Sequence, residues 1–292
     1  MLKFRHEWKY LVSSQQIATL ELRMNAILSS DANASGTGRK EYRITSLYFD
    51  DCHLSCYYEN ENGNDPRQKW RIRIYNHSSD KIFLEKKQKV KGMTRKERCL
   101  LEKTEALKLI HGDYNFASDK WPLKEFLIIA RTRAFSPSVI TEYDRIPYVY
   151  PIGNVRITLD RNISSSMDFD RFFDDRITVR PVLARGMHLL EVKYDELLPS
   201  FIFQALSMEA LQRSAFSKYY LCRRYCLSQP VNKPFSYEDS AAGDEGHSDQ
   251  VTVEEGQNEG SNKPDDSPNK VVGAVENSGE GHGSQAGEGN IV

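Results

Sequence analysis

The stretch KWRIRIY, Lys69–Tyr75, decides the fold. Aromatic and β-branched residues alternate in it with polar residues at period two, a pattern that predicts a β-strand. Its apolar face would carry Trp70, Ile72 and Ile74, and its polar face Lys69, Arg71, Arg73 and Tyr75. Three cations on one strand face repel one another unless water or an anion lies between them. The stretch is therefore either part of a solvated surface or one wall of a binding site.

Charged residues alternate at period two in several other predicted strands. We expect strands at 3–12, 41–50, 68–76, 80–91, 138–150, 153–163 and 187–196, and helices from Ser13 or Ser14 onward and at 101–111, 120–133 and 200–227. The charged faces hold Arg5, Glu7 and Lys9; Glu85, Lys87 and Lys89; Lys96 and Arg98; Arg145; Arg156, Thr158 and Asp160; and Glu191, Lys193 and Asp195. The helices lie between groups of strands and not after each strand, which favours an antiparallel or mixed α+β protein.

The repetition of this pattern changes its interpretation. A charged face on one antiparallel strand usually meets solvent. Several strands with the same pattern, each with an apolar opposite face, leave a second arrangement open: if the sheet closes, its charged faces line an interior. Unpaired buried charges are costly, so that interior must hold water and a polyanion. Its few acids, Glu7, Glu85 and Glu191, would pair with the cations or ligate a divalent metal.

The chain of 292 residues combines a basic body with an acidic tail. From about Val231 onward there are 13 acidic residues and 3 lysines, a net charge of −10, which leaves +9 on residues 1–230 of a chain whose total is −1. We expect one large domain at 1–229 and a disordered, acidic low-complexity tail at 230–292. The tail is either a solubilising extension or a polyanion mimic that competes for the mouth of the basic interior.

Several classes of protein are disfavoured. No apolar run approaches the ~20 residues that span a bilayer, and the N-terminus MLKFRHEWKYLV is too charged for a signal peptide. Five cysteines without a CxxC pair favour a reduced, cytoplasmic protein. The charged faces lack the interleaved aromatic residues of single-strand nucleic-acid binders. No P-loop or kinase signature is present, so phosphoryl chemistry would depend on cations and a metal.

Eight motifs in order carry a resemblance to a known family: FRHEWKYLV, SLYFDD, KWRIRIY, FLEKKQKVKGMTRKER, EYDRIPY, VRITLDRNI, LLEVKYDE and AFSKYYLC. Across residues 3–227 the chain resembles the VTC domain (polyphosphate polymerase) family of the triphosphate tunnel metalloenzyme superfamily, in a bacterial-type, stand-alone form. The resemblance implies an α+β fold in which about eight antiparallel strands close into a β-barrel, the triphosphate tunnel, with flanking helices. It also implies transfer of the γ-phosphoryl group of ATP to a growing polyphosphate chain, with Mn²⁺ or Mg²⁺ as cofactor.

Carried over residue by residue, the resemblance implies a candidate site. It implies catalytic roles in phosphate binding for Lys9, Arg71, Arg73, Lys87, Lys96, Arg145, Arg156, Lys193 and Lys218. It implies substrate binding by Lys69, Lys89, Arg98 and Ser217, with Lys69 at the rim, and metal ligation by Glu191, which Glu7 and Glu85 would join. Two positions depart from the family pattern. Asn60 stands where a Lys or Arg is expected, and Glu142 has opposite parity to Arg145, so its carboxylate should point outward.

Two other functions stay open at this point. One is a metal-dependent tripolyphosphatase or nucleoside triphosphatase, and the other is a non-catalytic polyphosphate-binding module. The expected partners are ATP and polyphosphate or triphosphate. Nucleic acid is not expected as a partner, and a membrane protein is an open candidate.

Overall fold

The computed structural model describes residues 4–30, 41–207 and 210–228. All of them fall within one compact unit, Met1–Asn232. The acidic tail predicted from residue 230 onward lies outside the described residues, so its predicted disorder stays a prediction. No helix in the described part of the chain is both long enough and apolar enough to cross a bilayer.

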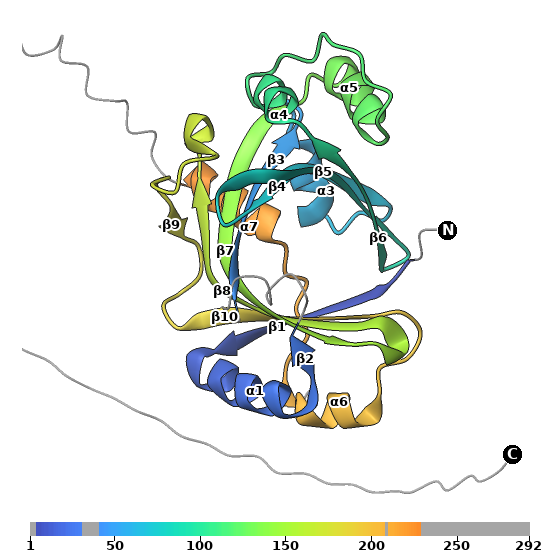
Figure 1. The fold of residues 1–292 in the computed structure, drawn as a ribbon, viewed down its shortest axis with the longest axis vertical. Helices are drawn as coiled ribbons and strands as arrows, with labels where there is room; N and C mark the ends of the chain where they lie inside the picture. The colour runs from blue at the N-terminus through green and yellow to red at the C-terminus, as the bar shows by residue number, and fades with distance from the viewer. Residues whose placement is uncertain (1–3, 31–40, 208–209, 229–292) are drawn as a thin grey trace, which may run out of the picture. The chain divides into compact units, whose positions relative to one another are not determined.

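One strongly curled antiparallel sheet dominates this unit (Figure 1). Its strands follow the order β1 (His6–Ser13), β10 (Met187–Tyr194), β8 (Val155–Ser166), β7 (Ser136–Tyr150), β3 (Tyr42–Asp50), β4 (Arg67–Tyr75), β5 (Ser78–Val90) and β6 (Met93–Leu101). Two short strands extend it, β2 (Ser29–Ser30) beside β7 and β9 (Arg180–Pro181) beside β8. The α+β class and the barrel-like sheet of about eight antiparallel strands are therefore as predicted, and the sheet curls into a half-barrel whose path of paired strands runs from β1 to β6.

The two edges of the curled sheet, β1 and β6, meet at one point. The backbones of Arg5 and Thr94 exchange two hydrogen bonds of 3.0 Å each, just before β1 begins. No residue range was predicted for β6, although Lys96 and Arg98 were placed on a charged face. It follows β5 through the turn Lys91–Gly92, where both residues have positive φ angles of 50° and 76°. Such two-residue turns match the twist of a β-hairpin, so β6 is the direct antiparallel partner of β5.

The helices are α1 (Ser14–Ile27), α3 (Ser55–Glu61), α4 (Lys103–Ile110), α5 (Leu123–Thr132), α6 (Ser200–Ala205) and α7 (Lys218–Ser228), with short 3₁₀ turns η1 (Ile152–Asn154) and η2 (Phe169–Arg171). As predicted, α1 begins after Ser13, whose side chain accepts a hydrogen bond from Gln16 N while the Gln16 side chain accepts one from Ser13 N. The predicted helix at 200–227 is in fact two helices. Between them, Ser214 N donates to Lys9 O at 2.8 Å, so this segment follows β1 instead of continuing as a helix.

The sheet carries its apolar side chains on the outer face. Trp70, Ile72 and Ile74 of β4 are fully buried there, and the Trp70 ring packs 5.2 Å from that of Phe126 in α5. A second apolar cluster places Val192 of β10 with residues of α1 and α6, which lie together on another side of the curled sheet (Figure 1). The helices therefore remove the outer face from water, which leaves the charged face of the sheet on the inside.

Candidate functional site

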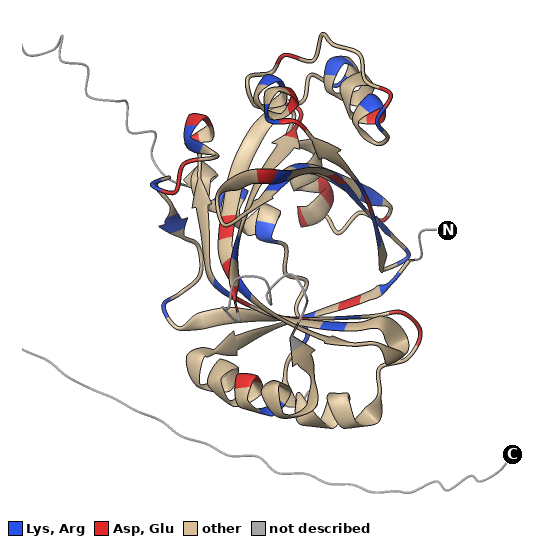
Figure 2. Cartoon of the chain, in the orientation of Figure 1, with Lys and Arg blue, Asp and Glu red and all other residues tan. Residues whose placement is uncertain are grey.

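The inner face of the sheet encloses two connected cavities. One, of about 420 Å³, lies at the start of α7 and is called here the narrow end. The other, of about 820 Å³, lies at the turn between β4 and β5 and is called the wide end. Along β4, Lys69 lines only the narrow end, Tyr75 only the wide end, and Arg71 and Arg73 line both. The two cavities are thus two ends of one lumen, and cations run along its strands (Figure 2).

The sixteen predicted site residues converge on this lumen with one exception. The narrow end is lined by Lys9, Lys69, Lys89, Glu191, Ser217 and Lys218, the wide end by Lys96, Arg98 and Arg156, and both by Glu7, Arg71, Arg73, Lys87, Arg145 and Lys193. Glu85 lines neither cavity and is fully buried beneath the cations. Residues from strands far apart in the sequence therefore form one surface, as the alternating pattern predicted.

Glu85 is the centre of the first charge cluster. Its Oε2 accepts hydrogen bonds from Arg71 at 2.6 and 2.8 Å, and its Oε1 accepts one from Lys96 at 2.8 Å, while Arg73 lies 3.5 Å away. Burial opposes ionisation of this carboxyl, but Arg73, Arg71 and Lys96 together hold its pKa well below the usual value. Glu85 is therefore a buried anion that fixes three phosphate-binding candidates in place.

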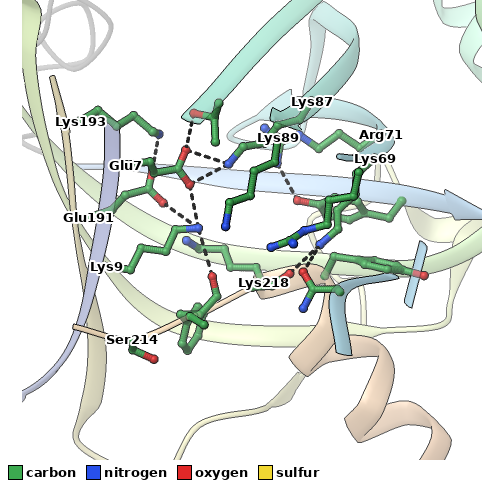
Figure 3. A pocket seen from close by; sticks show the side chains of 18 of the residues that line it. Glu7, Lys9, Lys69, Arg71, Lys87, Lys89, Glu191, Lys193, Ser214 and Lys218 are labelled. Carbon is green, nitrogen blue, oxygen red and sulfur yellow. Dashed lines mark hydrogen bonds and ion pairs between the residues drawn. The ribbon is translucent and has the colours of Figure 1, made fainter. Parts of the chain in front are cut away.

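Glu7 and Glu191 form the second cluster, in which carboxylates and lysines alternate. On the neighbouring strands β1 and β10, Lys9 lies opposite Glu191 and Glu7 lies opposite Lys193. Lys9 Nζ is 2.7 Å from Glu7 and 3.8 Å from Glu191, Lys87 Nζ is 2.7 Å from Glu7, and Lys193 pairs with Glu191. Figure 3 shows both carboxylates turned into the lumen among these lysines.

Burial and the neighbouring charges have opposing effects on the pKa values of this cluster. Burial opposes ionisation of Glu7 and Glu191, yet the neighbouring lysines hold the pKa of both well below the usual value. Burial lowers the pKa of Lys87 to about 7, although Glu7 opposes that shift. In this cluster, two carboxylates only partly compensate the positive charges of three lysines. The negative charges of a polyphosphate could compensate the remainder.

Asp160 is the centre of the third cluster, and sequence reasoning did not assign it to the site. Its carboxylate accepts two hydrogen bonds from Arg145, at 2.6 and 2.7 Å, and lies 2.6 Å from Lys218 Nζ. Burial opposes ionisation, but Arg145 and Lys218 lower the pKa of Asp160 below its usual value. The alternation Arg156, Thr158, Asp160 already placed this side chain on the inner face, so its parity was the available signal.

The narrow end holds lysines without a carboxylate partner in the described part of the chain. Lys69 Nζ donates to Asn60 Oδ1 at 2.7 Å and to Ser217 Oγ at 2.9 Å, both neutral groups. Lys89 projects into the same cavity (Figure 3). Burial and the neighbouring lysines Lys87 and Lys9 hold the pKa of Lys69 well below the usual value. Asn60, which departs from the family pattern, therefore orients a lysine here.

At the wide end, aromatic groups accompany the cations. Arg156 donates to the Tyr42 hydroxyl at 3.2 Å, and the Arg98 guanidinium lies 4.5 Å from the centre of the Phe83 ring. Glu142, by contrast, lines neither cavity and accepts a hydrogen bond of 3.0 Å from Thr45 on the outer face. Its outward direction is as its parity predicted.

The carboxylates differ in how they could serve a metal ion. Glu7 and Glu191 share Lys9 and face the lumen, whereas Glu85 is enclosed by three cations. Within residues 4–30, 41–207 and 210–228, no three His, Cys, Asp or Glu side chains gather as a metal site. Mg²⁺ is commonly held by one or two carboxylates together with substrate phosphates, and Glu7 with Glu191 matches that donor set.

Comparison with known proteins identifies the family. A family model described as VTC domain matches residues 4–226. No curated protein matches the chain.

Solved structures give more distant likenesses. They include a putative adenylate cyclase from Bacillus halodurans, with 15% identity over 70% of this chain and 91% of that chain and a TM-score of 0.43. A putative adenylyl cyclase from Hippeastrum, described as having a dominant triphosphatase activity, is 11% identical over 77% of this chain and 96% of that chain, with a TM-score of 0.45. An RNA triphosphatase from S. pombe is 12% identical over 77% of this chain and 81% of that chain, with a TM-score of 0.24.

Proposed function

Since the chain belongs to the VTC domain family, we propose that it is a polyphosphate polymerase. It transfers the γ-phosphoryl group of ATP to the end of a growing polyphosphate chain inside the lumen. The observation that carries this proposal is the set of cations that line the narrow end and the wide end, with Arg71 and Arg73 lining both. A row of cations suits a chain of phosphates better than a single phosphate.

The chain's own residues contribute positioning and charge. Arg71, Arg73 and Lys96 are held in fixed directions by Glu85, and Arg145 and Lys218 by Asp160. Phosphoryl transfer needs little covalent help from a protein, but it needs the reacting oxygens in line and their negative charge neutralised. Cations fixed before the substrate arrives meet both needs without reorganisation.

Glu7 and Glu191 are the proposed ligands for a divalent ion, Mn²⁺ or Mg²⁺. When bound, such an ion neutralises phosphate oxygens and polarises the transferred phosphoryl group. Lys9 pairs with both carboxylates, and its ammonium group also donates a hydrogen bond of 3.1 Å to the Phe216 carbonyl. The hydrogen bond to Phe216 holds Lys9 in the lumen, where it orients Glu7 and Glu191. Glu85 is not a proposed metal ligand, because three cations already surround its carboxylate. Its role is to hold those cations in place.

The test is a product assay with purified protein, ATP and Mn²⁺. Gel electrophoresis should show a ladder of long polyphosphate chains. Free phosphate as the sole product would contradict the proposal and favour a tripolyphosphatase, and binding of tripolyphosphate without turnover would favour a binding module. The full chain is used, so that the acidic tail is present as it is in the protein.

A pair of arginine variants connects this activity to the lumen. Arg71→Ala should weaken tripolyphosphate binding by about 1.5–3 kcal/mol, the range for hydrogen bonds to charged groups. Arg131→Ala is the matched control, because Arg131 is exposed on α5 and lines neither cavity. Equal affinities of the two variants in titration calorimetry would show that the phosphates bind elsewhere.

A further inference from the structure

The rim of the wide end carries an exposed tryptophan beside the tunnel cations. Trp121 lies just before α5 and is 59% exposed. A hollow of about 500 Å³ is lined by Trp121, Glu97 and the three cations Lys96, Arg98 and Arg156. The same three cations line the wide end of the lumen. The hollow therefore continues the phosphate-binding surface outward, and its outer boundary is an aromatic ring.

The ring is held in place by one edge. Trp121 Nε1 donates a hydrogen bond of 2.7 Å to Glu97 Oε2, and Arg95 donates one of 2.8 Å to Glu97 Oε1. A hydrogen bond at the edge fixes the indole without covering its faces. Glu97 is thereby engaged on both oxygens, so it does not leave a free carboxylate beside the cations.

The other aromatic rings at this end are already packed. Tyr42 and Tyr75 contact each other with ring centres 5.7 Å apart, and the Phe83 ring lies against Arg98. Among the aromatic residues that line this hollow and the two ends of the lumen, Trp121 alone is exposed. A large rigid aromatic ring left in water beside cations is a feature of ligand contacts more than of folding.

We propose that Trp121 is the stacking platform for the base of the nucleoside triphosphate whose phosphates lie in the lumen. The inference rests on the proposed function, because it takes a nucleotide as the phosphoryl donor. Lys96, Arg98 and Arg156 lie between the ring and the lumen, where the phosphates nearest the ribose would pass. Stacking on an aromatic face accepts any base, so the platform raises affinity for nucleotides without selecting strongly among bases.

The test compares two ligands that differ by the nucleoside. ATP and tripolyphosphate are titrated calorimetrically into the wild-type chain and into Trp121→Ala. Loss of one base-stacking contact should weaken ATP binding about fivefold or more and leave tripolyphosphate binding unchanged. Trp121→Phe keeps an aromatic face and should retain most of the ATP affinity. Ile128→Ala, an exposed apolar residue of α5 that lines none of the hollows, is the control.

Fluorescence gives a second readout that does not depend on turnover. The chain has three tryptophans, and Trp70 is fully buried. ATP should quench the emission of the wild-type chain, tripolyphosphate should not, and the quench should disappear in Trp121→Phe.

The outcomes separate this inference from the proposed function. If Trp121→Ala weakens ATP and tripolyphosphate equally, or weakens neither, the platform is refuted while phosphate binding in the lumen stands. If GTP and CTP do not bind within a few-fold of ATP, the platform as stated is also refuted. If the wild-type chain binds neither ATP nor tripolyphosphate, the proposed function fails, and the platform fails with it.

Discussion

Replacing Glu85 by Gln should strongly destabilise the ligand-free protein. The carboxylate is fully buried and is the shared partner of Arg71, Arg73 and Lys96. Gln keeps the shape of the side chain but removes the charge that compensates three cations. Breaking a buried charge cluster by removing one partner costs about 3–5 kcal/mol. At about 2–4 °C per kcal/mol for a domain of this size, the melting temperature should fall by about 6–20 °C.

Tripolyphosphate should recover much of the stability that Glu85→Gln loses. The ligand supplies negative charge to the same cations, and in the variant it no longer competes with the carboxylate. A ligand at a hundred times its Kd adds about 2.7 kcal/mol by mass action, and tighter binding adds more. Thermal unfolding followed by circular dichroism, with and without tripolyphosphate, should therefore show a larger ligand-induced shift for the variant than for the wild type.

The matched control for Glu85→Gln is Glu105→Gln. Glu105 pairs with Lys120 at 2.7 Å at the surface, so its loss should change stability by no more than about 1 kcal/mol. Gln also preserves the helix-capping hydrogen bond that Glu105 accepts from Glu102 N. If Glu85→Gln has the same melting temperature as the control, or if tripolyphosphate raises the melting temperatures of both variants equally, the assignment of Glu85 as the counter-charge of the lumen is wrong.

Acid titration tests the same cluster by a second route, because protonation also removes the negative charge of Glu85. The pKa of Glu85 is lowered in the folded protein, so the folded state binds fewer protons than the unfolded state below the ordinary glutamate pKa of about 4.3. The stabilisation from Glu85 is therefore complete above that pH and is lost as the pH falls towards the folded pKa. Glu85→Gln should make the acid limb of the stability profile less steep, and an unchanged slope would count against a charged Glu85.

Three further predictions concern the lumen and the outer face. Glu191→Gln should abolish metal-dependent turnover, while Glu142→Gln on the outer face should not; equal activity of the two would remove the metal assignment. Burial lowers the pKa of Lys87 to about 7 and that of Lys96 to about 8, so both lose their protons as the pH rises through that range. Phosphate favours the protonated lysines, so calorimetry should find tripolyphosphate binding weaker at pH 9 than at pH 6; tighter binding at pH 9 would contradict this sign. Trp70→Ala should cost about 3–5 kcal/mol in a denaturant titration because the ring is fully buried, yet tripolyphosphate affinity in the folded variant should be unchanged.

Much of the fold could be read from local pattern. The period-two alternation in KWRIRIY separates Trp70, Ile72 and Ile74 from the cations, and the structure places these sets on opposite faces of β4. Helix α3 was not predicted, because its last three residues begin the stretch ENENGND, Glu59–Asp65, which has the composition of a turn. Asp50, at the end of β3, accepts hydrogen bonds from Cys56 N and Tyr57 N. A residue outside the helix thus supplies the hydrogen-bond acceptors for backbone N–H groups of its first turn.

The sequence by itself determined which face of each strand each charged residue occupies, because side-chain direction in a strand depends only on parity. Only the tertiary structure decided that Arg5 and Thr94 join the two edges, and that Asp160 receives Arg145 and Lys218. Arg145 lies opposite Asp160 on the adjacent strands β7 and β8, but Arg5 and Thr94, and Asp160 and Lys218, are far apart in the chain. Those two long-range pairings depend on strand order and curvature, which local pattern does not specify. The inner face of the sheet was thus predictable from the sequence. The partner of each charge on that face was not.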